Sequence, residues 1–298
     1  MNLQSLFSEQ IISQTSLGGR ASDVWQVKTE NGEYVVRSSG VNENSDAPFL
    51  WACRNLFGIE LQHTYDIEYV NDQLGQMSTN IDVPRVIQKG IIDGRQFIVV
   101  EKMNGTEFRF LDMPPLMMEG FGMAIADIHS HGFSEYGAPA GTYRNPVEQF
   151  PQHLSNALSV LSSRYYNSNI EITSKLQYYC SLAENLPLPG SASYVMLDMD
   201  ARQFLAANHR VTAIVDTEAY VLGPRELDLV AIECSLDKNG AASFKKGYAA
   251  VLPFPDLSPV RDVYRFLFCL LEIKGPAVDY NSWLSSPRWF DSIGPSYK

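Results

Sequence analysis

Two aspartates and a glutamine in the second half of the chain could do chemistry together. Asp198 follows an apolar run that begins at Ser193, Gln203 stands five residues later, and Asp216 ends a second apolar run over 211–215. An acid at the end of a strand exposes its oxygens to a metal ion or a hydroxyl group. Phosphoryl transfer uses such a set: one carboxylate orients the acceptor hydroxyl, and other side-chain oxygens hold Mg²⁺ against the nucleotide phosphates.

This stretch resembles the aminoglycoside phosphotransferase and choline kinase-like family, which shares the protein-kinase-like fold. The family pattern is H-G-D-x-x-x-x-N, then a β-hairpin, then I-D-W or a similar sequence. Here it reads Met196-Leu197-Asp198, then Gln203, then Val215-Asp216-Thr217. Glu226-Leu227-Asp228-Leu229 resembles the downstream Y-D-L-A segment. The resemblance is strongest over residues 194–229 and extends over about 17–272.

The resemblance implies a role for each of these residues. Asp198 is expected to orient the acceptor hydroxyl and take its proton, while Gln203 and Asp216 hold Mg²⁺. Asp228 is expected to support the catalytic loop. Gln203 replaces the family asparagine, and its amide still offers a carbonyl oxygen to Mg²⁺.

Asp200 is a second candidate for the base, and spacing argues against it. The residue five positions after Asp200 is Leu205, which cannot ligate a metal. Asp200 stands where the family often has histidine, so we expect it, together with Glu218, at the acceptor pocket.

The N-terminal third resembles the nucleotide-binding half of the family. The small-residue loop over 17–23, with Gly19 and Ser22, resembles the loop that covers the phosphates. The segment Glu101-Lys102-Met103 resembles the hinge whose backbone groups bind adenine, so Glu101 and Met103 are predicted to be nucleotide-binding residues.

Arg37 stands where the family has a strand lysine that contacts the phosphates, and Glu68 lies at a fitting distance to hold it. Both are therefore predicted to belong to the nucleotide site, joined by an ion pair. Arginine keeps the positive charge, but its planar fork makes it a different phosphate ligand from lysine.

Element patterns place these motifs in two lobes. Strand-like runs on either side of Asn31-Gly32 predict a tight hairpin, a helix is expected over 64–77, and two further strands are joined at Asp93-Gly94. Helical periodicity dominates from residue 115 onward. We expect an α+β, bilobal protein-kinase-like fold, with a small antiparallel-sheet lobe over residues 1–100. A larger, mainly helical lobe over 101–298 would carry the catalytic loop and the acceptor pocket.

Composition limits the partners. The net charge of −11 over 298 residues argues against nucleic acid, whose phosphates require a basic surface, and favours a cationic acceptor. No run approaches the roughly 18 apolar residues of a membrane span, and no leader-like segment opens the chain, so a cytoplasmic protein without membrane contact is expected. Four widely spaced cysteines predict reduced thiols rather than a zinc or redox site.

The expected function is transfer of the γ-phosphoryl group of ATP or GTP, with Mg²⁺, to a hydroxyl of a small molecule such as an aminoglycoside or an amino alcohol. Met196, Arg37 and Gln203 depart from the family pattern and keep an alternative open. That alternative is a catalytically inactive, pseudokinase-like nucleotide-binding protein with a regulatory role. A plain α+β binding module, which would respond to no nucleotide, is a third interpretation.

Overall fold

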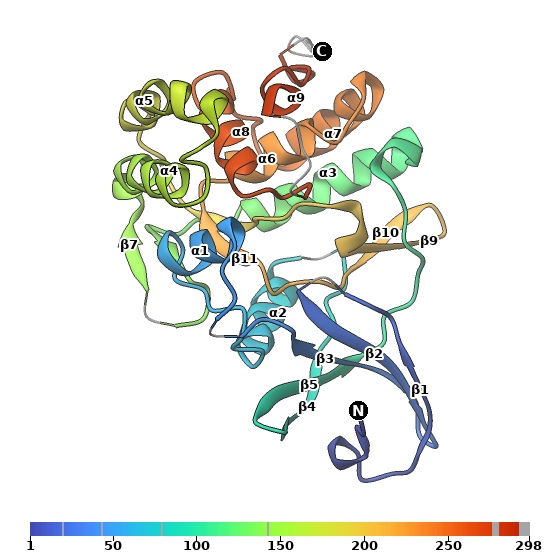
Figure 1. Ribbon diagram of the computed structural model, residues 1–298. Coiled ribbons are helices and arrows are strands. Elements are labelled where there is room, and N and C mark those ends of the chain that lie inside the picture. The colour runs from blue at the N-terminus through green and yellow to red at the C-terminus, as the bar shows by residue number, and fades with distance from the viewer. Residues whose placement is uncertain (20, 43, 79, 142, 276–279, 292–298) are drawn as a thin grey trace.

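A five-stranded antiparallel sheet forms the lower part of the molecule in the view of Figure 1. The structure, a computed structural model, describes residues 1–291 except 20, 43, 79, 142 and 276–279. The strands lie in the order β1-β2-β3-β5-β4. Their bounds are β1 (Ile11–Ser16), β2 (Ser22–Thr29), β3 (Glu33–Ser39), β4 (Val86–Ile92) and β5 (Arg95–Glu101).

Alternation along the strands gives this sheet two buried faces. One face, with Val36 and Phe97, packs on the N-terminal segment that contains η1 (Gln4–Leu6). The opposite face, with Ile98, packs on α2 (Asp66–Met77). Arg37 follows Val36 on β3 and therefore points to the α2 side.

Helices form the upper part of the molecule (Figure 1). They are α3 (Pro115–His129), α4 (Phe150–Tyr165), α5 (Ile170–Glu184), α6 (Glu226–Glu233), α7 (Lys238–Val251), α8 (Arg261–Leu270) and α9 (Tyr280–Leu284). The short helices η2 (Phe110–Asp112) and η3 (Val147–Gln149) precede α3 and α4. The largest helix contact joins α3 to α7, where a Cβ on Gly247 would lie 1.8 Å from the Glu119 carbonyl oxygen. Glycine therefore permits the close crossing of these two helices.

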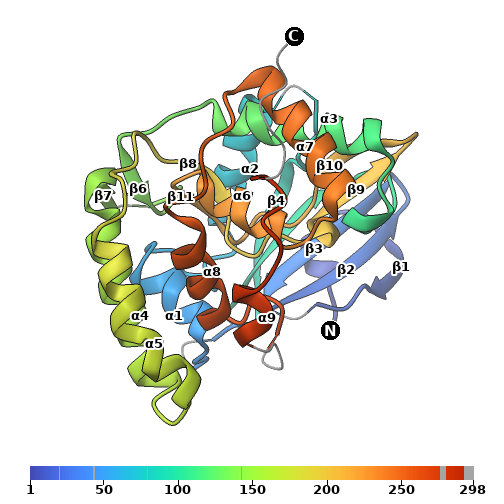
Figure 2. The same cartoon turned by 90° about the horizontal axis from the view of Figure 1, so that it is seen from above.

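Short strands support the segment that carries the acids. A four-stranded sheet has the order β7-β6-β11-β8, with β6 (Glu135–Gly137), β7 (Arg144–Pro146), β8 (Ser193–Met196) and β11 (Tyr220–Gly223). A separate hairpin pairs β9 (Phe204–Ala207) with β10 (Arg210–Ile214). Both views place this hairpin between the five-stranded sheet and α3 (Figures 1 and 2).

Helix α1 (Pro48–Asn55) packs with the helical part although it precedes α2 in the chain. Cys53 and Phe57 are buried in the same core as α4, and the Phe57 ring meets Tyr136 edge-on. The chain thus passes from the sheet to the helical part and back between β3 and α2. A lobe boundary at residue 100 remains a prediction, and packing assigns residues 48–57 to the helical side.

The sequence patterns predicted most of these elements. The hairpin at Asn31-Gly32 joins β2 to β3, the helix expected over 64–77 is α2, and Asp93-Gly94 joins β4 to β5. Among the described residues, no helix is long and apolar enough to cross a membrane.

Candidate active site

The predicted catalytic loop follows strand β8 and leads into a tight hairpin. Asp198 follows β8 by two residues, and Gln203 ends the 3-10 helix η4 (Ala201–Gln203). Asn208 and His209, with φ of 52° and 58°, turn β9 back into β10. The Val215 N–H then donates to the Gln203 carbonyl oxygen at 2.9 Å, which places Asp216 beside the loop.

The three predicted catalytic and metal residues meet at this point. Gln203 Nε2 donates to Asp198 Oδ2 at 2.9 Å, which leaves the amide oxygen of Gln203 for another partner. Burial and the nearby carboxylates of Asp216 and Glu218 raise the pKa of Asp198 to about 8. Residues that lie eighteen positions apart in the chain therefore share one small, electrostatically crowded volume.

Arg37 reaches the same volume from strand β3. Its Nη2 lies 2.6 Å from Asp216 Oδ1, and its Nη1 donates to the Val215 carbonyl oxygen. Burial opposes the guanidinium charge, but the carboxylates of Asp216 and Glu218 outweigh burial and raise the pKa of Arg37. The cation expected at the phosphates thus lies directly against the acid expected at the metal.

Glu218 closes the other side of this group. Its Oε2 lies 3.7 Å from Arg37 Nη2 and accepts a hydrogen bond from Ser22 Oγ at 2.5 Å. Burial and the charge of Asp216 raise the pKa of Glu218. Three carboxylates therefore face one guanidinium, and this excess of negative charge suits a divalent cation.

The protein supplies only part of a metal shell. Within the described ranges, no group of three or more His, Cys, Asp and Glu side chains could hold a metal ion. Mg²⁺ keeps several waters and takes one or two protein carboxylates plus phosphate oxygens in nucleotide sites, so Asp216 with the Gln203 amide oxygen fits that pattern.

The predicted ion pair between Arg37 and Glu68 is wrong. Glu68 on α2 instead pairs with Lys89 of β4, whose ammonium also lies over the Tyr65 ring at 5.3 Å from its centroid. The register explains this, because Arg37 and Lys89 flank Ile98 from opposite sides. Two strand spacings, or roughly 10 Å, therefore separate the backbones of Arg37 and Lys89.

The predicted phosphate loop precedes β2 and the predicted hinge follows β5, so the two segments lie at opposite ends of β3, where Ser22 pairs with Ser39 and Glu101 with Tyr34. A Cβ on Gly19 would come within 1.8 Å of the Ser22 carbonyl oxygen, so this turn requires glycine. Glu101 ends β5, and its carboxylate pairs with Arg85, which lowers the pKa of Glu101. The Met103 N–H has no hydrogen-bond partner among the described residues and is available to a nucleobase.

The hinge also borders an open cavity of about 570 Å³. Its wall combines hinge residues with the ends of strands from both parts of the molecule: Glu33, Tyr34, Asp82, Ile87, Glu101, Lys102, Met103, Asn104, Ala207 and Thr212.

Asp228 on α6 contacts the backbone at the end of β8, just before the predicted catalytic loop. Its Oδ1 accepts from the Met196 N–H at 2.8 Å, and its Oδ2 lies 3.1 Å from His129 Nε2. Burial raises the pKa of Asp228, and these hydrogen bonds oppose the shift. His129 carries no sequence signal for this contact beyond its place at the end of a helix, and sequence reasoning missed it.

Asp200 lies at the start of η4 and pairs locally. Its Oδ1 accepts from the Arg202 backbone N–H and from Arg202 Nε, both at 2.9 Å. Its carboxylate therefore caps the short helix, and its predicted place in the acceptor pocket stays a prediction.

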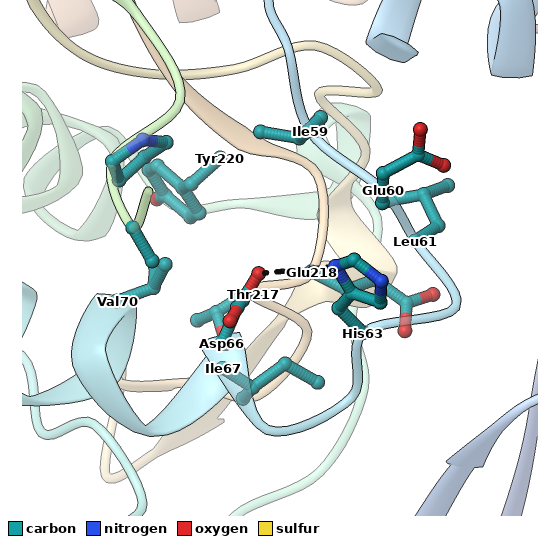
Figure 3. Close-up of a pocket in the computed structure, with 12 residues that line it drawn as sticks. Ile59, Glu60, Leu61, His63, Asp66, Ile67, Val70, Thr217, Glu218 and Tyr220 are labelled. Carbon is teal, nitrogen blue, oxygen red and sulfur yellow. Dashed lines mark ion pairs between the residues drawn. The ribbon is translucent and has the colours of Figure 1, made fainter. Parts of the chain in front are cut away.

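A small pocket of about 30 Å³ lies beside Glu218 (Figure 3). The β10–β11 connection forms one side and the α1–α2 connection another. The lining residues are Ile59, Glu60, Leu61, His63, Asp66, Ile67, Val70, Pro139, Ala140, Thr217, Glu218 and Tyr220.

Several solved structures with a similar fold are phosphotransferases. Macrolide 2′-phosphotransferase MphH from Brachybacterium faecium aligns over 98% of this chain and 97% of its own, with a TM-score of 0.59 and 12% identity. Aminoglycoside phosphotransferase APH(4)-Ia, in a ternary complex with AMP-PNP and hygromycin B, aligns over 90% and 87%, with a TM-score of 0.63 and 15% identity. Spectinomycin phosphotransferase APH(9)-Ia, in complex with ADP and spectinomycin, aligns over 98% and 92%, with a TM-score of 0.59 and 13% identity.

These alignments confirm the predicted bilobal, protein-kinase-like α+β fold and the predicted structural resemblance to aminoglycoside phosphotransferases. No family model and no curated protein sequence matches the chain.

Proposed function

We propose that the protein is a small-molecule phosphotransferase that moves the γ-phosphoryl group of ATP or GTP to an acceptor hydroxyl. One observation carries the proposal. Asp198, Gln203 and Asp216, from the catalytic loop and its hairpin, meet Arg37, which comes from the opposite sheet. A carboxylate base, two oxygen ligands for a cation and a phosphate-binding guanidinium are the parts that phosphoryl transfer requires.

Each residue has one task in this proposal. Asp198 accepts a hydrogen bond from the acceptor hydroxyl and takes its proton as the oxygen bonds to the γ-phosphorus. The bond between that phosphorus and its bridging oxygen breaks, and the nucleoside diphosphate leaves with the electron pair. Gln203 and Asp216 would hold Mg²⁺, which supplies charge neutralisation at the phosphates, and Arg37 would bind phosphate oxygens.

The nucleotide would lie between the loop at Gly19 and Ser22 and the hinge. The backbone groups of Glu101 and Met103 would bind the base, since the Met103 N–H has no internal partner in the described residues. Residues 1–100 would chiefly cover the nucleotide, and residues 101–298 would hold the catalytic loop and the acceptor.

The acceptor is proposed to be a small, cationic molecule. Two of the aligned phosphotransferases, APH(4)-Ia and APH(9)-Ia, are in complex with hygromycin B and spectinomycin respectively, which supports a small-molecule substrate. The net charge of −11 favours a cation. Asp200 would be an acceptor-facing acid.

Thermal unfolding with Mg-ATP and Mg-GTP tests the nucleotide site. A ligand at 100 times its dissociation constant stabilises by about 2.7 kcal/mol, which is roughly 5 °C for a chain of this size. Wild type should show this rise with at least one nucleotide, and Asp216→Asn or excess EDTA should remove it. Equal unfolding temperatures with and without millimolar nucleotide would refute the nucleotide site.

Transfer itself is tested by release of nucleoside diphosphate in the presence of panels of aminoglycosides, amino alcohols and neutral sugars. A cationic acceptor should stimulate release by wild type and not by Asp198→Asn. Nucleotide binding without stimulated release by any acceptor would favour the inactive, pseudokinase-like alternative.

A further inference from the structure

Glu218 lies between Ser22, in the predicted phosphate loop, and Arg37, the cation proposed to bind the phosphates. It lies two residues after Asp216, and its side chain is only 14% exposed. Its contacts are Arg37 on β3 and Ser22 at the start of β2. We propose that Glu218 is the positioning residue that holds Arg37 for the nucleotide phosphates, in place of a glutamate on α2; this inference rests on the proposed function.

The sheet register leaves Arg37 without a carboxylate from α2. Glu68 pairs with Lys89, and Ile98 separates Lys89 from Arg37 across the sheet. A buried guanidinium cannot lose its proton and needs a paired charge. Among the described residues, the carboxylates within 4 Å of Arg37 are those of Asp216 and Glu218.

Asp216 cannot serve Arg37 alone in the proposed reaction. The same carboxylate would ligate Mg²⁺, which competes with the guanidinium for its oxygens. Glu218, at 3.7 Å from Arg37 Nη2, would keep the arginine oriented when Asp216 turns to the metal. Its placement beside both groups therefore provides the second charge that the site requires.

Two further hydrogen bonds fix the segment that carries Glu218. Thr217 Oγ1 donates to Asn71 Oδ1 on α2, and Asn71 Nδ2 donates to the Pro84 carbonyl oxygen at 2.7 Å. The Ser22 hydroxyl then links Glu218 to the phosphate loop. Helix α2 thus contributes to the site by holding the Glu218 segment through Asn71.

A double-mutant cycle tests this role through nucleotide affinity measured by calorimetry. Glu218→Gln should weaken binding of Mg-ATP, or of Mg-GTP if that is the nucleotide wild type binds, by about 10–100-fold. In an Arg37→Met background, the same substitution should weaken binding less than about threefold, because its effect passes through Arg37. A purely structural role would give the same loss in both backgrounds and would overturn the proposal.

Matched variants separate the other outcomes. Glu119→Gln removes an exposed ion pair between α3 and Lys246 of α7 and should leave affinity unchanged. Glu68→Gln tests the competing assignment: a loss there with none at Glu218 overturns the proposal. If Arg37→Met does not fold, Glu218→Asp is the deciding variant, because it retains the negative charge. It should bind the nucleotide at least fivefold more tightly than Glu218→Gln, and equal affinities would overturn the proposal.

The proposed function and this inference fail in different ways. If wild type binds neither nucleotide, the phosphotransferase proposal falls first. If wild type binds nucleotide and Glu218→Gln binds it equally well, the phosphotransferase proposal stands and the role of Glu218 is refuted.

Discussion

Replacing Glu233 by glutamine should destabilise the protein by about 3–5 kcal/mol, the usual result of breaking a buried ion pair. Glu233 ends α6, and its side chain is fully buried. It accepts hydrogen bonds from Arg261 Nε at 2.7 Å, Arg265 Nη2 at 2.9 Å and the Phe290 N–H at 3.0 Å. Glutamine removes a carboxylate that faces both arginines, although Arg261 retains Asp291.

The loss should fall at the lower end of that range, because Asp291 still compensates one of the two guanidinium groups. Among the described residues, Arg265 would then have no carboxylate partner and would keep the carbonyl oxygens of Ser286 and Pro287. A loss of about 3 kcal/mol corresponds to roughly 6 °C in the unfolding temperature of a chain of this length. Unfolding by urea, followed by circular dichroism and by tryptophan fluorescence, measures the free energy directly.

Glu119→Gln is the matched control for this measurement. Its carboxylate is 27% exposed and pairs with Lys246 at 2.8 Å on the surface, so its loss should be at most about 1 kcal/mol. If Glu233→Gln is no more destabilising than Glu119→Gln, the buried cluster contributes nothing to folding and the reasoning is refuted. An unchanged m-value would show that the substitution altered stability rather than the extent of unfolding.

Three further perturbations have defined outcomes. Asp198→Asn should lower the rate of phosphoryl transfer by about 10²–10⁴-fold. It should also stabilise the metal-free protein by about 1 kcal/mol, because one of three crowded carboxylates is removed. A lower unfolding temperature than wild type in EDTA would contradict this. Thr217→Val should cost about 1–3 kcal/mol in urea unfolding, because it removes the hydroxyl that donates to buried Asn71. Gly247→Ala should cost about 1–3 kcal/mol by forcing α7 away from α3, and wild-type calorimetric stability would show that the helices do not cross this closely.

The convergence of Asp198, Gln203 and Asp216 was predictable because it depends on local chain geometry. Gln203 lies five residues after Asp198, within a single loop and one turn of 3-10 helix. Asp216 returns to the loop through a hairpin whose turn, Asn208-His209, is short and left-handed. Spacing in the sequence therefore translates almost directly into distance.

The partner of Arg37 was not predictable in the same way. Glu68 lies on α2, the helix expected to supply the partner, and its spacing from the strands is compatible with a contact to Arg37. Whether the two side chains pair depends on the order and register of β3, β5 and β4. No local sequence pattern predicts that Ile98 of β5 lies between Arg37 and Lys89. The packing of α1 against α4 likewise depends on long-range contacts. The local sequence shows that residues such as Phe57 are apolar, but it does not show which core they join.

The arginine and the missing α2 ion pair have one physical explanation. A lysine ammonium is a compact point charge, whereas a guanidinium presents several N–H donors in a plane. Arg37 uses that plane to reach the Val215 carbonyl oxygen and Asp216 at once, with Glu218 at 3.7 Å. A lysine at this position could not span all three, so it would depend on a carboxylate from α2. The guanidinium of Arg37 and the carboxylate of Glu218 on the β10–β11 connection therefore form one arrangement, and we expect Arg37→Lys to weaken nucleotide binding, measured by calorimetry, unless a nearby acid is supplied on α2.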